Sequence, residues 1–267
     1  MADVYTTITE ADQAVLEDIA RVLELRAADP RQKEMLDSYI AELRLGEVTR
    51  VLEVGCGTGA VTRALAEHAT RAVVTGVDPS STLVAKAREL SSGCSRVSFD
   101  EGDARALAYD DGSYEVVVFH TSLSHIPGPE TALAEAFRVL VPGGRLVVFD
   151  GDYATTTVAT GDFDPLQACA DATIAYLVHD RWLMRRLPSL IEAAGFVMTY
   201  SRSYGYVETD APSYTLTLVD RGADQLVASG RIGAETAEAL KAEARRRVET
   251  STFFGHIAYA VVCATRP

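Results

Sequence analysis

A glycine-rich turn in the N-terminal half of the chain holds the residues best suited to bind a ligand. An apolar, β-branched run leads into Glu53, and helix-compatible sequence begins at Ala60. Between them stand three alternating glycines, Gly55, Gly57 and Gly59. This order predicts a buried strand, a tight turn and a helix N-terminus. Because glycines let a ligand lie against the backbone and a helix start offers free N–H groups, we expect a nucleotide-like cofactor here.

The glycine turn alone leaves the cofactor open. Gly55, Gly57 and Ala60 fit the G-x-G-x-x-G/A fingerprint of dinucleotide sites, and Asp78 follows a second strand-like run, where an acid would bind a ribose. A site for S-adenosylmethionine also uses a ribose-binding acid at that place. A nicotinamide cofactor and S-adenosylmethionine therefore both remain possible at this point, and a chance glycine turn is a third interpretation.

Later motifs separate the two cofactors. Gly102-Asp103-Ala104 follows a third strand-like run, residues 114–119 form a fourth, and Pro142-Gly143-Gly144 precedes a fifth at 146–150. With the glycine turn, this series resembles the class I S-adenosylmethionine-dependent methyltransferases in motifs and in order. The resemblance is close over about residues 51–150 and holds only in outline elsewhere, and it disfavours a nicotinamide oxidoreductase.

The resemblance implies a cofactor site spread over four strand ends. Glu53 and the glycines would hold the methionine end of S-adenosylmethionine, Asp78 the ribose hydroxyls, and Asp103 with Ala104 the adenine. The expected cofactor-binding set is Glu53, Gly55, Cys56, Gly57, Gly59, Asp78, Pro79, Asp103, Ala104, His120 and Thr121.

Candidate catalytic residues lie after the fourth and fifth strand-like runs. His120 would line the sulfonium site, and His125 falls where relatives resembling ubiquinone and menaquinone C-methyltransferases often carry histidine. A structural hydrogen bond is the competing interpretation for His125. Asp152 could orient a substrate hydroxyl or amine at the end of its strand, or cap the following turn. Arg26 could pair with the cofactor carboxylate, but a solvated arginine is the favoured interpretation.

These residues need an α/β fold to bring them together. Strands and helices alternate from about residue 51 to 150, which predicts a parallel sheet with helices on both faces. The resemblance implies a Rossmann-like, seven-stranded, mostly parallel sheet whose last strand, near 257–262, is antiparallel.

Helical sequence flanks and interrupts this pattern. Apolar spacing between about residues 9 and 43 predicts two helices separated at Pro30, and the resemblance implies an N-terminal helical lid over 1–46. Residues 47–267 would then form the cofactor-binding domain, with inserted caps at about 151–182 and 209–254. Further helices are expected at 162–179, 183–194 with a break or restart at Pro188, 213–229 and 234–250.

Composition narrows the class of protein. The chain has 267 residues, 48% of them hydrophobic, and a net charge of −13, which argues against a nucleic-acid partner. No apolar run reaches the ~18 residues of a membrane helix. Residues Met1–Tyr5 lack the basic start of a signal peptide, and the four cysteines have no metal-binding or paired spacing, so we expect a cytoplasmic protein without a metal. A helical cap could also pair two copies as a homodimer.

The sequence therefore predicts an S-adenosylmethionine-dependent methyltransferase. It would transfer a methyl group by in-line displacement to an O, N or C atom of a small molecule, natural-product-like or quinone-like, as in secondary metabolism. The alternative is a non-methylating, cyclase-type enzyme on the same scaffold that keeps the cofactor for structure. A binding protein that senses the cofactor is a third, less favoured class.

Overall fold

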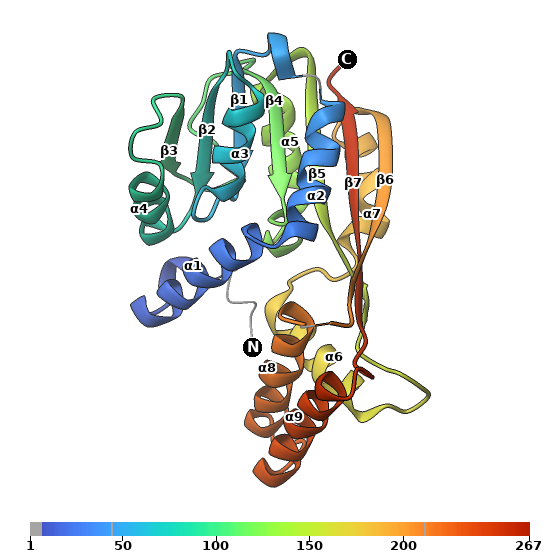
Figure 1. Ribbon diagram of the computed structural model, residues 1–267. Coiled ribbons are helices and arrows are strands. Elements are labelled where there is room, and N and C mark those ends of the chain that lie inside the picture. Colours follow the sequence, from blue (N-terminus) through green and yellow to red (C-terminus); the bar gives the residue numbers. More distant parts are fainter. Residues whose placement is uncertain (1–6, 44, 211) are drawn as a thin grey trace.

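A computed structural model describes residues 7–43, 45–210 and 212–267. Residues Met1–Tyr5, from which the absence of a signal peptide was predicted, lie outside the described residues. Over these ranges the chain forms a sheet of seven strands in the order β3-β2-β1-β4-β5-β7-β6, with helices around it (Figure 1). The strands are β1 (Arg50–Val54), β2 (Val73–Asp78), β3 (Val97–Glu101), β4 (Tyr114–His120), β5 (Leu140–Thr157), β6 (Val197–Glu208) and β7 (Gly255–Thr265).

Strand direction follows the predicted fold class. Strands β3, β2, β1, β4 and β5 pair in parallel, whereas β7 runs antiparallel to both β5 and β6. The Rossmann-like sheet with an antiparallel last strand is therefore confirmed. Because parallel strands place their carboxyl ends at one edge, the loops after β1, β2 and β4 meet there.

Helices cover both faces of the sheet. They are α1 (Gln13–Ala27), α2 (Pro30–Glu42), α3 (Ala60–His68), α4 (Ser81–Leu90), α5 (Pro129–Val139), α6 (Pro165–Leu177), α7 (Leu183–Ala193), α8 (Tyr214–Ala228) and α9 (Ala234–Glu249). One apolar core joins α2 and α3 to the sheet, and a second joins α5 and α7 to it. The near-continuous apolar strands β1 and β4 are buried because both of their faces are covered.

Local sequence sets where several helices begin. The carboxylate of Asp29 accepts hydrogen bonds from the backbone N–H groups of Arg31 and Gln32, and Pro30 fills the first turn of α2. Asp164 caps α6 in the same way, followed by Pro165. Each start combines an N-cap acid with a proline whose missing N–H costs nothing there.

Two expectations about the C-terminal half are wrong. Helix α7 continues through Pro188 instead of breaking, since its buried face packs against α5 and the sheet while the proline removes only one helical hydrogen bond. Strand β5 does not end near Asp150 but runs on to Thr157, because the long strand β7 pairs with it beyond the main sheet.

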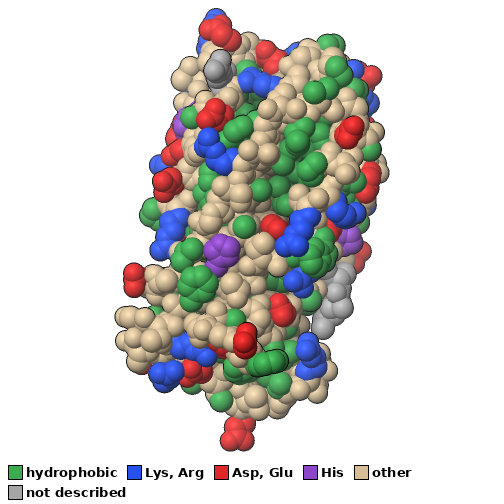
Figure 2. Space-filling view, turned by 90° about the vertical axis from the view of Figure 1, so that its right-hand side faces the viewer, with side chains coloured by type: hydrophobic (Ala, Val, Ile, Leu, Met, Phe, Trp, Pro, Cys, Tyr) green, Lys and Arg blue, Asp and Glu red, His purple; other side chains and the backbone are tan. Residues whose placement is uncertain are grey.

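The lengthened strands lead to a group of helices below the sheet, seen in the lower part of Figure 1. We call α6, α8 and α9, with the loop 158–164, the helical extension. Its own apolar core is built from side chains of all three helices. Figure 2 views the molecule from the sheet edge formed by β6, at the opposite end of the sheet from β3. Hydrophobic side chains on this face are interrupted by charged ones. Charged groups on an edge strand discourage pairing with another chain.

Candidate functional site

A cavity of about 570 Å³ lies where the loops after β1, β2 and β4 meet the N-terminal helices α1 and α2. This volume is within the range of small-molecule sites. Eight of the predicted cofactor-binding residues line it: Glu53, Gly55, Cys56, Gly57, Asp78, Pro79, His120 and Thr121. The helical pair contributes Leu23, Arg26, Gln32 and Leu36, and the loop after β4 also contributes His125.

The glycine turn is shaped by its neighbours within the protein. Gly55 and Gly57 have positive φ angles of 76° and 51°, which favour glycine. A Cβ atom on Gly55 would lie 2.4 Å from Cβ of Ser122, and one on Gly57 would lie 2.8 Å from Cδ1 of Leu23. Glycine is therefore needed here because the turn packs closely on the β4 loop and on α1, in addition to any contact with a ligand.

Glu53, at the end of β1, is a buried acid whose pKa is far above its ordinary value. Its side chain is 2% exposed and accepts a hydrogen bond from the hydroxyl of Thr62. Burial raises the pKa of Glu53 to about 8, while the Thr62 hydrogen bond acts to lower it. At neutral pH the group is therefore largely protonated, and a cation bound beside it would favour its ionised form.

Asp78, at the end of β2, holds the glycine turn in place. Its carboxylate accepts hydrogen bonds from the backbone N–H groups of Gly57 and Ser80, both at 2.9 Å. Burial raises its pKa and these two hydrogen bonds act to lower it. Since a carboxylate offers about four acceptor positions, Asp78 keeps capacity for ligand hydroxyls in the cavity.

His120, at the end of β4, is held as a neutral ring. Its Nδ1 lies 2.8 Å from the hydroxyl of Tyr39, and its ring stacks on Phe149 with centroids 4.7 Å apart. Burial, together with the positive charge of Arg26, lowers the pKa of His120 to about 3. The residue therefore adds no charge to the cavity, and it is a weak base.

The loop after His120 is locally strained. Thr121 has a φ of 51°, which is unfavourable for a β-branched residue, and its N–H donates to the carbonyl of Phe149 at 2.7 Å. Strained backbone concentrates at functional sites, where the surrounding structure enforces it. The sequence carries no signal for this feature.

His125 lies in a short 3-10 turn, Leu123–His125, that also lines the cavity. Its ring centroid is 6.2 Å from that of Tyr153. The neighbouring Asp150 is buried and accepts hydrogen bonds from the N–H and hydroxyl of Ser124 and from the N–H of Gly151. Burial raises the pKa of Asp150, and His125 acts to lower it. This acid fixes the loop that carries His125.

Four predicted site residues lie outside the cavity lining: Gly59, Asp103, Ala104 and Asp152. Asp103 is 45% exposed and pairs with Arg105 at 2.7 Å, which lowers its pKa. Asp152 pairs with Arg185 at 2.9 Å. Because β5 continues past it, Asp152 is neither at a strand end nor the cap of a following turn.

Sequence reasoning expected a helical lid but did not identify which polar side chains of the helical pair line the cavity. Arg26 is not the solvated residue that was favoured: it lines the cavity, its guanidinium lies 5.7 Å from the centre of the Tyr259 ring, and its Nη2 is buried without a hydrogen-bond partner. The buried side chain of Gln32 also leaves Oε1 without a partner. Helical spacing in α1 and α2 identifies an apolar face but not which polar side chains face the cleft.

Among the residues that the structure describes, no cluster of three or more His, Cys, Asp or Glu side chains is arranged to hold a metal ion. Within the same ranges, no helix has the length and apolar character to cross a bilayer.

The chain is similar to several known methyltransferases and to one cyclase. A family model described as a methyltransferase domain matches residues 51–144. A demethylmenaquinone methyltransferase from Lactococcus lactis is 34% identical over 45% of this chain and 50% of its own length. Methyltransferase GfsG from Streptomyces halstedii is 33% identical over 61% and 58%. The solved structure of the cyclase SpnF matches with a TM-score of 0.55 and 25% identity, over 88% of this chain and 82% of that one.

These matches are partial in length. The chain spans between 50% and 65% of the length of three curated relatives that it matches. The shared part includes the glycine turn and the strands whose ends line the cavity.

Proposed function

We propose that the chain, which resembles the class I S-adenosylmethionine-dependent methyltransferases, binds S-adenosylmethionine in the cavity and methylates a small molecule. The observation that carries the proposal is the convergence of Glu53, the glycine turn and Asp78 on one cavity beside His120. Bound there, S-adenosylmethionine would supply an electrophilic methyl group on a sulfonium.

The residues present fit this cofactor. Glu53 offers a buried acid for the ammonium of the methionine tail, and Asp78 keeps free acceptor positions for ribose hydroxyls. The orphaned Oε1 of Gln32 offers a further acceptor in the same cavity. Asp103 and Ala104 lie beyond the cavity lining, and we propose that they meet the adenine only at its outer edge.

The chain's contribution to the reaction is mainly orientation. Alignment of reacting groups can supply about 7–11 kcal/mol, against roughly 3–6 kcal/mol from a general base. His120, neutral because it is buried, would line the transfer site without repelling a sulfonium, and it would be a poor base there. We propose that His125 positions the acceptor and that Asp152, paired with Arg185, has a structural role.

The N-terminal helices and the caps complete the proposal. Helices α1 and α2 line the cavity, so residues 1–46 would act as its lid. The inserted segments at about 151–182 and 209–254 would bound the acceptor. The demethylmenaquinone methyltransferase named above supports a quinone-like acceptor. A natural-product-like acceptor, methylated like the first on O, N or C, stays part of the proposal.

A cyclase-type enzyme that keeps the cofactor without consuming it is the second candidate, favoured by the match to SpnF. The two functions differ in stoichiometry. A methyltransferase releases one S-adenosylhomocysteine for each acceptor converted, whereas the cyclase-type enzyme converts acceptor with none released.

Calorimetry tests the cofactor assignment directly. We expect S-adenosylhomocysteine to bind the protein while NAD does not, and Asp78→Asn to weaken binding at least tenfold because a charged hydrogen-bond acceptor is lost. Asp110→Asn, an exposed acid away from the cavity, is the matched control and should bind as the parent does. Failure of the parent to bind, or equal binding by Asp78→Asn, would refute the proposal.

A further inference from the structure

We propose that the methyl acceptor is an acid and that its ionised oxygen atoms bind Arg26. The inference rests on the proposed function, because it assigns the acceptor side of the same cavity. It identifies the acceptor by chemical class: an apolar or aromatic molecule carrying a carboxylate or a comparably acidic oxygen.

Arg26 differs from the other cations that line the cavity. Arg63 forms an ion pair with Glu24 at 2.9 Å, and Lys33 is exposed to solvent. In the described part of the chain, the side chain of Arg26 forms no ion pair with an acid, and its buried Nη2 has no hydrogen-bond partner. A guanidinium keeps its charge under all ordinary conditions, so this site holds a positive charge that the protein does not neutralise.

The groups facing Arg26 come from one side of the cleft. The ring of Tyr259 on β7 lies under the guanidinium, and Tyr153 on β5 and Tyr214 on α8 are close enough to affect its pKa. Burial acts to lower the pKa of Arg26, but the phenols in their ionised form, together with Asp150, outweigh burial, so the pKa lies above its ordinary value. All of these elements lie on the β5 side of β4.

Asp150 does not serve as the missing partner. It is fully buried and its carboxylate already accepts hydrogen bonds from Ser124 and Gly151. No ion pair joins it to Arg26 in the described ranges, although its charge is felt there.

The position of Arg26 favours the acceptor, and not the cofactor, as the molecule whose anion it binds. Glu53, the glycine turn and Asp78 lie at the ends of β1 and β2, whereas Arg26 faces β5, β7 and α8. Its charge also acts on His120 at the end of β4, which lies between the two sides. An acid bound to Arg26 would therefore sit across the transfer site from the cofactor's sugar.

The shape and surroundings of Arg26 define the class of ligand. Its planar donors suit the two oxygens of a carboxylate. The apolar side chains that line the same cavity, among them Leu23, Leu36 and Ile126, suit an aromatic or apolar body. An anion beside Arg26 would also offset the repulsion between this cation and a sulfonium in the same cavity.

The test compares an acid with its neutral analogue. Benzoate and benzamide have the same shape and differ in charge, so each is titrated into the protein at pH 7.5, with and without S-adenosylhomocysteine. We expect benzoate to bind at least tenfold more tightly than benzamide, and Arg26→Met to abolish that preference. Arg26→Lys, which keeps the charge without the planar fork, should retain part of it. Arg21→Met, at an exposed arginine of the same helix paired with Asp18, is the control and should bind as the parent does.

Each outcome bears on the inference. Equal binding of benzoate and benzamide by the parent, or an unchanged preference in Arg26→Met, would overturn it. Binding of S-adenosylhomocysteine is expected to change less than threefold in Arg26→Met. A large loss for S-adenosylhomocysteine with no loss for decarboxylated S-adenosylmethionine would instead assign Arg26 to the cofactor carboxylate and also overturn it. Lack of S-adenosylhomocysteine binding by the parent would refute the proposed function, while the titration without it still reports on Arg26.

Discussion

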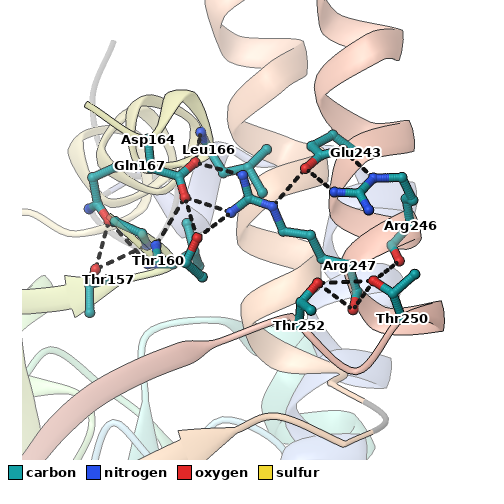
Figure 3. Close-up of polar contacts among 12 residues, drawn as sticks. Thr157, Thr160, Asp164, Leu166, Gln167, Glu243, Arg246, Arg247, Thr250 and Thr252 are labelled. Carbon is teal, nitrogen blue, oxygen red and sulfur yellow. Dashed lines mark hydrogen bonds and ion pairs between the residues drawn. The ribbon is translucent and has the colours of Figure 1, made fainter. Parts of the chain in front are cut away.

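Arg26 at the cavity and Arg247 in the helical extension are both largely enclosed, but the protein treats their charges differently. Figure 3 shows Arg247 between Asp164 and Glu243, with nitrogen–oxygen distances of 2.5 and 2.8 Å. The side chains of Arg247 and Asp164 are 12% and 4% exposed. In the extension the chain supplies every partner, which indicates a structural role, whereas at the cavity it leaves a cation without a counter-ion.

Two buried acids show the same difference. Burial raises the pKa of Glu53 at the cavity to about 8. Burial also acts to raise the pKa of Asp164 in the extension, but hydrogen bonds from Arg247, Thr160 and Leu166 outweigh it and bring the value to about 2. A charged group whose partners come from the fold is stabilised in its charged form, and one without such partners is not.

The largest expected effect is on stability in the extension. Arg247→Met should lower the free energy of unfolding by about 3–5 kcal/mol, because it leaves the carboxylate of Asp164 buried without its cation. Urea denaturation followed by circular dichroism measures this change. Arg246→Met is the matched control: its side chain is 58% exposed, and losing its pair with Glu243 should leave the free energy of unfolding nearly unchanged. Equal losses for the two variants would mean that the enclosed pair of Arg247 with Asp164 adds no more stability than an exposed ion pair, and Arg247 would lose its structural role.

The sequence predicted the positions of cavity residues well where they belong to a short, continuous motif. Glu53, the glycines and Asp78 were placed correctly at strand ends because apolar runs and glycines mark those positions. The parallel direction of most strands and the antiparallel last strand followed from the alternating pattern and the family resemblance, whereas the order of the strands in the sheet was not predicted. Backbone positions at the ends of buried strands are fixed by the fold itself.

Features that depend on packing between distant segments were not predictable. The side of α1 that carries Arg26 is set by how the helix rests on the cleft, which the apolar spacing leaves open. The extension of β5 to Thr157 depends on β7, about a hundred residues later in the chain. Pairing of Asp103 with Arg105 depends on the conformation of their loop, for which two residues of separation give no signal.

The second largest expected effect is the pH dependence of stability that comes from Glu53 at the cavity. In the unfolded chain Glu53 ionises near pH 4.5, but in the folded protein it keeps its proton to about pH 8. Between these values the unfolded state binds fewer protons, so the free energy of unfolding falls as pH rises, and the loss is complete above pH 8. Glu53→Gln removes this slope. Each pKa unit is worth about 1.4 kcal/mol, and burial of the amide offsets part of the total, so we expect a gain of roughly 2–3 kcal/mol at pH 8.5.

The pH dependence distinguishes this effect from a simple change in packing. Urea denaturation of the parent and of Glu53→Gln at pH 4.5, 6.5 and 8.5 should show a difference that grows with pH. It should run from a loss of roughly 2 kcal/mol in the variant at pH 4.5, where only the burial cost of the amide remains, to the gain at pH 8.5. A constant difference at all three pH values would mean that Glu53 is not held protonated. It would then resemble Asp164, and the two regions would no longer differ in how they treat buried acids.

The smallest expected effect tests Arg26 itself in the absence of any ligand. A charge kept from water without a partner is destabilising, so Arg26→Met should raise the free energy of unfolding, even though the contact with the Tyr259 ring is lost. Because part of the side chain reaches the cavity, the net gain should be only about 0.5–1 kcal/mol. Urea denaturation at pH 7.5 and low salt measures it.

The change in the free energy of unfolding should have the opposite sign to that of Arg247→Met, because the same substitution would stabilise one region and destabilise the other. A loss of 1 kcal/mol or more in Arg26→Met would show that the tyrosine rings and Asp150 already compensate this cation, and Arg26 would then be a structural residue like Arg247.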